Sequence, residues 1–152
     1  MNLEQYSIIS DSSHLSYKFE SVGPKGIIRK VVRYTLIKDL FENYYNLSFG
    51  DWDEITGRID DNIISNNNDT KKVLLTVAFT ALQFVNHFPE AEILIVGSTK
   101  SRTRLYQMAI NENIIEIDKL FELQGFRNGD LEKFKTGINF DAFLIKKKIK
   151  KM

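Results

Sequence analysis

A short segment past the middle of the chain gathers side chains that could bind a phosphate. Residues 96–104 read VGSTKSRTR, which combines a glycine, several hydroxyl residues, one lysine and two arginines. The amides and positive dipole at a helix N-terminus favour an anion, and a guanidinium offers paired donors that match a phosphate. We therefore predict an anion site between Gly97 and Arg104, with the candidate residues Ser98, Thr99, Lys100, Arg102, Arg104 and Tyr106.

The spacing within this segment predicts which side chains meet. If a helix begins here, Ser98 or Thr99 lies one turn before Arg102, and Tyr106 lies one turn after it. Arg104 then points elsewhere, towards the inner sheet. The alternative is structural: Ser98 or Thr99 caps the helix, and the arginines pair with acidic side chains. The segment is not the GxxxxGK[ST] phosphate loop, so both interpretations stay open.

Two helices and the strand between them are expected to position this segment. Residues 70–88 contain neither glycine nor proline and carry apolar side chains at helical spacing, which predicts a buried helix capped by Asn68 or Asp69 and ended by Pro89. The run EILIV at 92–96 predicts a strand covered on both faces. A second helix is expected over residues 100–111, with an inner stripe of Leu105, Met108 and Ala109.

The remaining segments predict strands. Residues 14–20 and 27–37 are rich in β-branched and aromatic types around a turn at 22–26, and residues 45–49 alternate apolar and polar types. Residues 120–126 and 131–134 flank an Asn-Gly turn, and residues 139–148 form a last strand. We read residues 51–69 as a loop with a short strand near Ile63 and Ile64. The predicted fold class is α+β, a mixed or largely antiparallel sheet packed by two main helices, 70–88 and 100–111.

Length and composition narrow the classes of protein. With 152 residues, 43% of them apolar, the chain is expected to form a single domain over residues 1–152. It has no cysteine and only two histidines, so we expect no metal site and no cofactor. Neither a signal peptide nor an apolar run of membrane-spanning length is present, and we therefore expect a cytoplasmic protein without membrane contact.

The charges sum to +1 but are unevenly distributed. An acidic stretch (Asp51, Asp53, Glu54, Asp60 and Asp61) contrasts with a basic tail over residues 146–152. The acidic stretch lacks the spacing of a calcium-binding loop and is expected to be solvated or to face a basic partner, including the tail of a second copy. The tail is expected to fray in solvent or to track a phosphate backbone, together with Arg29 and Arg33 of the predicted hairpin.

Longer stretches of the chain resemble an uncharacterised bacterial family of unknown function. The most specific feature is a GSTxxRTRLY core, matched by residues 97–106, and a second is an NFDAFLIKKK-like strand at residues 139–148. The runs KVLLTV at 72–77 and HFPEA at 87–91 extend the similarity over nearly the whole chain. The resemblance brings no established activity. It implies a compact bacterial protein of a sort suspected of belonging to toxin–antitoxin-like pairs.

Two hypotheses about function follow. In the first, the protein binds a phosphate-bearing ligand, RNA or a nucleotide, between Gly97 and Arg104. Its enzymatic form is a toxin acting on RNA, with Arg102 and Arg104 stabilising phosphate charge and Tyr106 as an acid or orienting group. In the second, the protein is a non-enzymatic interaction module for a small partner protein or a second copy, and the arginines are structural.

Overall fold

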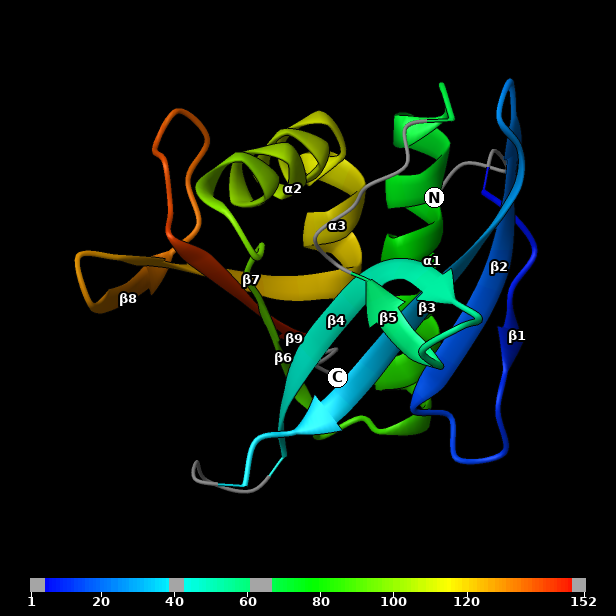
Figure 1. Ribbon diagram of the computed structural model, residues 1–152. Coiled ribbons are helices and arrows are strands. Elements are labelled where there is room, and N and C mark those ends of the chain that lie inside the picture. Colours follow the sequence, from blue (N-terminus) through cyan, green and yellow to red (C-terminus); the bar gives the residue numbers. More distant parts are fainter. Residues whose placement is uncertain (1–4, 39–42, 61–66, 149–152) are drawn as a thin grey trace. The chain divides into compact units, whose positions relative to one another are not determined.

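The computed structural model describes residues 5–38, 43–60 and 67–148 (Figure 1). Within these ranges the chain forms three helices and a mixed, mostly antiparallel sheet of nine strands, which confirms the predicted α+β class. Contacts along the chain group its residues into two compact units, which we describe separately. Unit 1 comprises Met1–Thr35 and Leu47–Phe84, and unit 2 comprises Leu36–Asn46 and Val85–Met152. The predicted single domain stays a prediction.

Unit 1 is built on a long hairpin packed against a helix. Its elements are β1 (Ile9–Ser10), β2 (Ser16–Gly23), β3 (Gly26–Leu36), β4 (Tyr44–Asp53), β5 (Arg58–Asp60) and α1 (Thr70–His87), of which β3, β4 and α1 extend into unit 2. The strand order is β1-β2-β3-β4, and β5 pairs with β4. Antiparallel pairing of β2 and β3 down to Gly23 and Gly26 confirms the predicted hairpin, and Gly26 has the positive φ of 86° that favours glycine.

Aromatic rings fill the space between this sheet and α1. Phe19 of β2 stacks against both Tyr6 and Phe49, with ring centroids 5.8 and 6.5 Å apart. Tyr34 stacks on Phe84 of α1 at 4.2 Å, and its hydroxyl lies 2.8 Å from Thr80 Oγ1. The predicted buried helix is confirmed, since side chains along α1 from Val73 to Val85 are buried.

The predicted loop over residues 51–69 is wrong for its first part. Strand β4 continues through Asp53, and β5 returns beside it, with Trp52 opposite Ile59. Asp53 builds the turn between them: its Oδ1 accepts the Ile55 amide at 2.9 Å, and its carbonyl oxygen accepts the amide of Gly57 at 2.8 Å. The acidic residues therefore belong to a hairpin. Asp61 and the strand predicted near Ile63 and Ile64 lie outside the described residues.

Unit 2 combines the start of β4 with β6 (Glu92–Ile95), α2 (Lys100–Glu112), α3 (Ile114–Leu120), β7 (Phe121–Arg127), β8 (Asp130–Lys133) and β9 (Ala142–Lys147). The order is β4-β6-β9-β7-β8; β4 and β6 run parallel, and the other pairs are antiparallel. Asn128 and Gly129 both have positive φ, 54° and 81°, which confirms the predicted two-residue turn between β7 and β8.

Helix α2 buries a different face from the predicted one. Its buried side chains are Thr103, Gln107 and Ile110, whereas Met108, assigned to the inner stripe, is 57% exposed. The reason is that the polar side chains Thr103 and Gln107 find backbone partners in unit 2, as described below. Helix α3 had not been predicted.

The first part of the predicted frayed tail, residues 146–148, makes defined contacts. Lys146 and Lys147 belong to β9, and Lys146 Nζ lies 3.3 Å from Glu122 of β7. Lys148 donates to the carbonyl of Asp118 at 2.6 Å. The first lysines of the predicted tail thus pair within unit 2, and residues 149–152 lie outside the described part of the chain. Strand β9 begins at Ala142, three residues later than predicted.

Candidate functional site

The junction between β6 and α2 is held together by its own backbone and hydroxyl groups. The Gly97 amide donates to Thr103 Oγ1 at 3.0 Å, and that hydroxyl donates to the Thr99 carbonyl at 3.2 Å. A Cβ atom on Gly97 would lie 2.5 Å from the Thr103 amide nitrogen and 2.6 Å from Cβ of Arg102. Glycine is therefore required here because strand end and helix start approach so closely.

The first turn of α2 brings some of the predicted site residues together. Thr99 is the N-cap and accepts the Arg102 amide at 3.2 Å, while the Arg102 guanidinium donates to Ser98 Oγ at 2.9 Å. Ser98 and Lys100 are exposed, and this turn contains no acidic residue. The hydroxyl, ammonium and guanidinium groups thus lie at a helix N-terminus that no carboxylate of its own first turn neutralises.

Arg104 lies in a different environment. Its Nη1 donates to Gln107 Oε1 at 2.7 Å and to the Phe140 carbonyl at 2.8 Å. Gln107, only 4% exposed, also accepts the Phe140 amide at 3.0 Å and donates to the Ile138 carbonyl. We call Arg104 and Gln107 the Gln107 clamp, because they fasten the segment that enters β9 to α2.

Both arginines make contacts within the chain, as the structural alternative expected, but their partners differ from the expected ones. Among the described residues both arginines bond to neutral oxygens, of Ser98 for Arg102 and of Gln107 and the backbone for Arg104, where carboxylates were expected. Tyr106, one turn beyond Arg102, is half-buried. The predicted site is thereby divided: Ser98, Thr99 and Arg102 lie together, and Arg104 serves the packing of unit 2.

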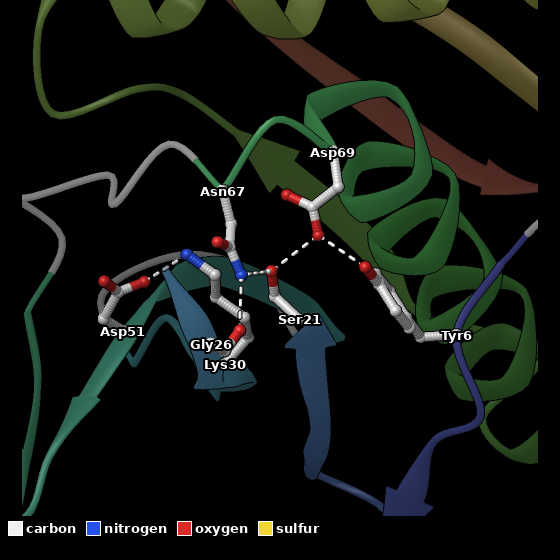
Figure 2. A network of polar contacts seen from close by, with 7 residues as sticks. All are labelled: Tyr6, Ser21, Gly26, Lys30, Asp51, Asn67 and Asp69. Atoms are coloured by element: carbon white, nitrogen blue, oxygen red, sulfur yellow. Dashed lines mark hydrogen bonds and ion pairs between the residues drawn. The ribbon is translucent and has the colours of Figure 1, made fainter. Parts of the chain in front are cut away.

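Unit 1 contains a polar network that sequence reasoning missed (Figure 2). Asp69, just before α1, accepts the Ser21 hydroxyl at 2.5 Å and the Tyr6 hydroxyl at 2.6 Å. Asn67, 1% exposed, donates to Ser21 Oγ at 3.2 Å and to the Gly26 carbonyl at 2.9 Å, and it accepts the Lys25 amide at 2.7 Å. We call Tyr6, Ser21, Asn67 and Asp69 the Asn67 clamp, because they fasten the β2–β3 turn to the start of α1.

Burial and the hydrogen bond to Asp69 raise the pKa of the Tyr6 phenol above its ordinary value, so this group is neutral over the physiological range. The cap predicted at Asn68 or Asp69 stays a prediction; one carboxylate oxygen of Asp69 accepts the hydroxyls of Ser21 on β2 and of Tyr6. The sequence signal for this network was the run of polar residues just before α1. The loop predicted over residues 51–69 included that run, so its side chains were not considered as a network.

A buried ion pair lies beside the Asn67 clamp (Figure 2). Lys30 of β3 has a side chain that is 2% exposed, and its ammonium contacts the Asp51 carboxylate of β4, which is 15% exposed. In the sequence of β3, Lys30 alternates with the apolar residues Ile28, Val32 and Tyr34, and this alternation was the available signal. A lysine on a core face needs a nearby anion, and Asp51 on the next strand supplies it.

The hairpin of unit 1 also carries a shallow double hollow. Two adjoining hollows of about 510 and 530 Å³ share Glu20, Arg29 and Trp52 in their linings. Arg29 pairs with Glu54 at 2.6 Å, and the Lys18 ammonium lies 5.2 Å from the centre of the Trp52 ring. Because Arg29 is matched by Glu54, this surface is of mixed charge. The basic surface expected from the tail with Arg29 and Arg33 stays a prediction.

Two negative observations apply to the described ranges. No helix among residues 5–38, 43–60 and 67–148 is both long and apolar enough to span a membrane. In the same part of the chain no three histidine, aspartate or glutamate side chains gather as a metal ion would require.

Comparison with curated proteins gives no match, and comparison with solved structures gives none either. One family model does match, over residues 2–148, and it includes both clamps and the junction between β6 and α2. That range covers nearly the whole chain and agrees with the extent of the resemblance seen in the sequence. The protein therefore belongs to DUF6934, a family of unknown function.

Proposed function

We propose that this chain, a small bacterial protein of the cytoplasm, binds a phosphate-bearing ligand, RNA or a nucleotide, at the start of α2. The observation that carries the proposal is the first turn of α2, where Arg102 is held beside Ser98 at 2.9 Å and no acidic residue is present. Helix amides, the helix dipole and a guanidinium all favour the same anion. Lys100 adds a second cation at the same turn.

The Gln107 clamp supports this proposal indirectly. It fixes α2 against the segment entering β9, and the Gly97–Thr103 bond fixes the junction itself. A rigid scaffold lowers the entropy lost when a ligand is bound. Arg104 thereby positions the helix, and the ligand-contacting set narrows to Ser98, Thr99, Lys100 and Arg102.

A toxin that cleaves or modifies RNA is the enzymatic form of this proposal. Arg102 would stabilise phosphate charge in the transition state, and Tyr106, one turn along α2, would act as acid or orienting group. Expression of wild type and of Arg102→Ala and Tyr106→Phe variants in a bacterial host tests it. Equal growth with all three proteins at equal abundance would remove the toxin form and leave ligand binding standing.

Ligand binding itself is tested by fluorescence anisotropy with a short labelled single-stranded RNA and with labelled ATP, at low and high salt. Arg102→Ala should weaken binding and lower the salt dependence of RNA affinity by roughly 0.7 units per lost phosphate contact. Arg58→Ala is the matched control, because Arg58 is an exposed arginine on β5 that belongs to no candidate phosphate surface, and its removal changes the net charge equally. Equal losses in both variants, or no binding by wild type, would refute a site at α2.

The second candidate function is a non-enzymatic interaction module. Exposed apolar side chains in unit 1 favour it, since Ile9, Ile27 and Ile55 are 75%, 64% and 97% exposed. This candidate predicts that no nucleotide or RNA shifts the melting temperature. It also predicts that Arg104→Ala lowers that temperature without any ligand effect.

A further inference from the structure

Helix α2 carries one large apolar side chain, Met108, on its outer side. Thr103 and Gln107, both 4% exposed, face inward, whereas Met108 is 57% exposed and Leu105 is half-buried. At 100° per residue, Leu105 and Met108 share the side opposite to Thr103 and Gln107. Met108, with the half-buried Leu105 beside it, is therefore available to another protein surface.

The order of the charges along α2 indicates which kind of protein surface would pack against it. Lys100, Arg104, Met108 and Glu112 follow one another at spacings of four, so they form one row along the helix. The first turn has no acidic residue and the last turn no basic one. This order, cations first and an anion last, opposes the helix dipole and is unfavourable for α2 alone. A second, identical helix lying antiparallel would place its acidic end beside the basic end of α2. The two helix dipoles would then also run in opposite directions.

We propose that α2 is a homodimer interface in which a second copy of this chain lies antiparallel across it, with the two-fold axis near Met108. In this arrangement Met108 packs against the partner's Met108, and Arg104 faces the partner's Glu112. The two residues are each four positions from Met108, or about 6 Å along the helix, so their rows coincide after the two-fold rotation.

The contacts of Arg104 are compatible with this pairing. Its bonds to Gln107 and Phe140 leave from Nη1 alone, and a guanidinium has five N–H donors. The other donors can therefore receive the partner's Glu112 while the Gln107 clamp stays closed. The same interaction occurs twice, because an isologous interface repeats each contact.

Sedimentation velocity over a range of protein concentrations tests the proposal with Met108→Glu and a matched control, Ile55→Glu, at another exposed apolar side chain. Wild type and Ile55→Glu should dimerise, and Met108→Glu should raise the dimer Kd roughly tenfold or more. Circular dichroism confirms that each variant is folded. A monomeric wild type at every concentration, or a Met108→Glu variant that dimerises like wild type, would overturn the proposal.

The absence of cysteine allows a second test that does not depend on weakening the dimer. Met108→Cys should be joined to its counterpart by a short bismaleimide cross-linker, because both thiols lie near the axis, whereas Ile55→Cys should not. Glu112→Arg should reduce that cross-linking by opposing two guanidinium groups. Equal cross-linking of Met108→Cys and Ile55→Cys would overturn the interface. Neither Met108 nor Glu112 belongs to the proposed ligand site, so these results are independent of ligand binding.

Discussion

The Asn67 clamp of unit 1 and the Gln107 clamp of unit 2 both fasten an irregular segment of backbone, but the side chains joined to the central amide differ. In each, a buried amide side chain both donates to and accepts from the backbone of an irregular segment. Asn67 is joined to the ionisable groups Asp69 and Tyr6 through Ser21, whereas Gln107 is joined to Arg104. One clamp therefore contains a phenol that can titrate, and the other contains a guanidinium that keeps its charge.

This difference shows that a charged residue within a candidate binding segment can serve packing instead. Arg104 is a candidate phosphate ligand by residue type, because a guanidinium binds phosphate, yet its hydrogen bonds are to Gln107 and to the Phe140 carbonyl. The residues that organise both clamps are the amides, which no functional motif singled out. An amide is suited to this role because it carries both donors and an acceptor and satisfies backbone groups without a charge.

The largest expected effect tests the Gln107 clamp. Gln107→Ala leaves the Phe140 amide and the Ile138 carbonyl without their partner and removes one of the two bonds of Arg104. We therefore expect a loss of about 3 kcal/mol in the free energy of unfolding. Urea denaturation measures it, with Gln83→Ala on the exposed side of α1 as the control. A loss in Gln107→Ala no greater than in the control would show that the clamp is dispensable.

A smaller loss, about 2 kcal/mol, is expected for Asn67→Ala. Its backbone partners belong to Lys25 and Gly26, which are exposed at the hairpin tip and can turn to water when the amide is removed. Hydrogen exchange should show faster exchange of the Lys25 amide, with the Phe140 amide less affected. Asn86→Ala, at an exposed position of α1, is the control. A loss larger than that of Gln107→Ala would reverse the proposed ranking.

The two clamps should also differ in alkaline solution. Burial raises the pKa of Tyr17 to about 12, and burial together with Asp69 raises that of Tyr6. A raised pKa in the folded state gives stability that is complete below the ordinary value of 10.0 and is lost as the pH rises through the folded value. The free energy of unfolding should thus fall between about pH 10 and 12.

Hydrogen exchange cannot follow this readily, because amide exchange is fast in base, so we would use urea denaturation at each pH. Tyr6→Phe should make the alkaline loss shallower. Gln107→Ala should lower stability equally at every pH, since no group of its clamp titrates there. If the free energy of unfolding of Tyr6→Phe fell with pH as steeply as that of wild type, Tyr6 would not contribute to the alkaline loss.

The smallest effects compare two tyrosines of unit 1. The Tyr17 hydroxyl is buried without a hydrogen-bond partner among the described residues, whereas the Tyr34 hydroxyl bonds to Thr80 at 2.8 Å. Tyr17→Phe should therefore stabilise the protein by up to about 1 kcal/mol, and Tyr34→Phe should destabilise it by about 1 kcal/mol. Thermal denaturation of both variants gives the comparison. Changes in stability of the same sign and size in the two variants would contradict this prediction.

Local patterns predicted the elements whose signals are local. The spacing of apolar residues in α1, the turn of β2 and β3, and Asn128-Gly129 between β7 and β8 were all confirmed. The capped start of α2 and the Ser98–Arg102 contact also followed from spacing alone. Each depends on side chains within about one helical turn or one hairpin of each other, where sequence distance sets spatial distance.

The errors occurred where a distant partner decided the outcome. Residues 51–53 were assigned to a loop because of their charge, but Asp51 meets Lys30 of β3 and the strand continues. The inner face of α2 was assigned by hydrophobicity, but Thr103 and Gln107 satisfy the backbone of Gly97, Ile138 and Phe140 and so displace Met108 outward.

By itself, therefore, the sequence determined the α+β class, the main helices, the hairpins and a capped, cationic start of α2. Only the tertiary structure decided that Arg104 belongs to a clamp, that Lys30 is buried against Asp51, and that Met108 faces outward. The physical reason is that burying a polar or charged group costs free energy unless a partner meets it, and those partners come from strands and segments remote in the chain.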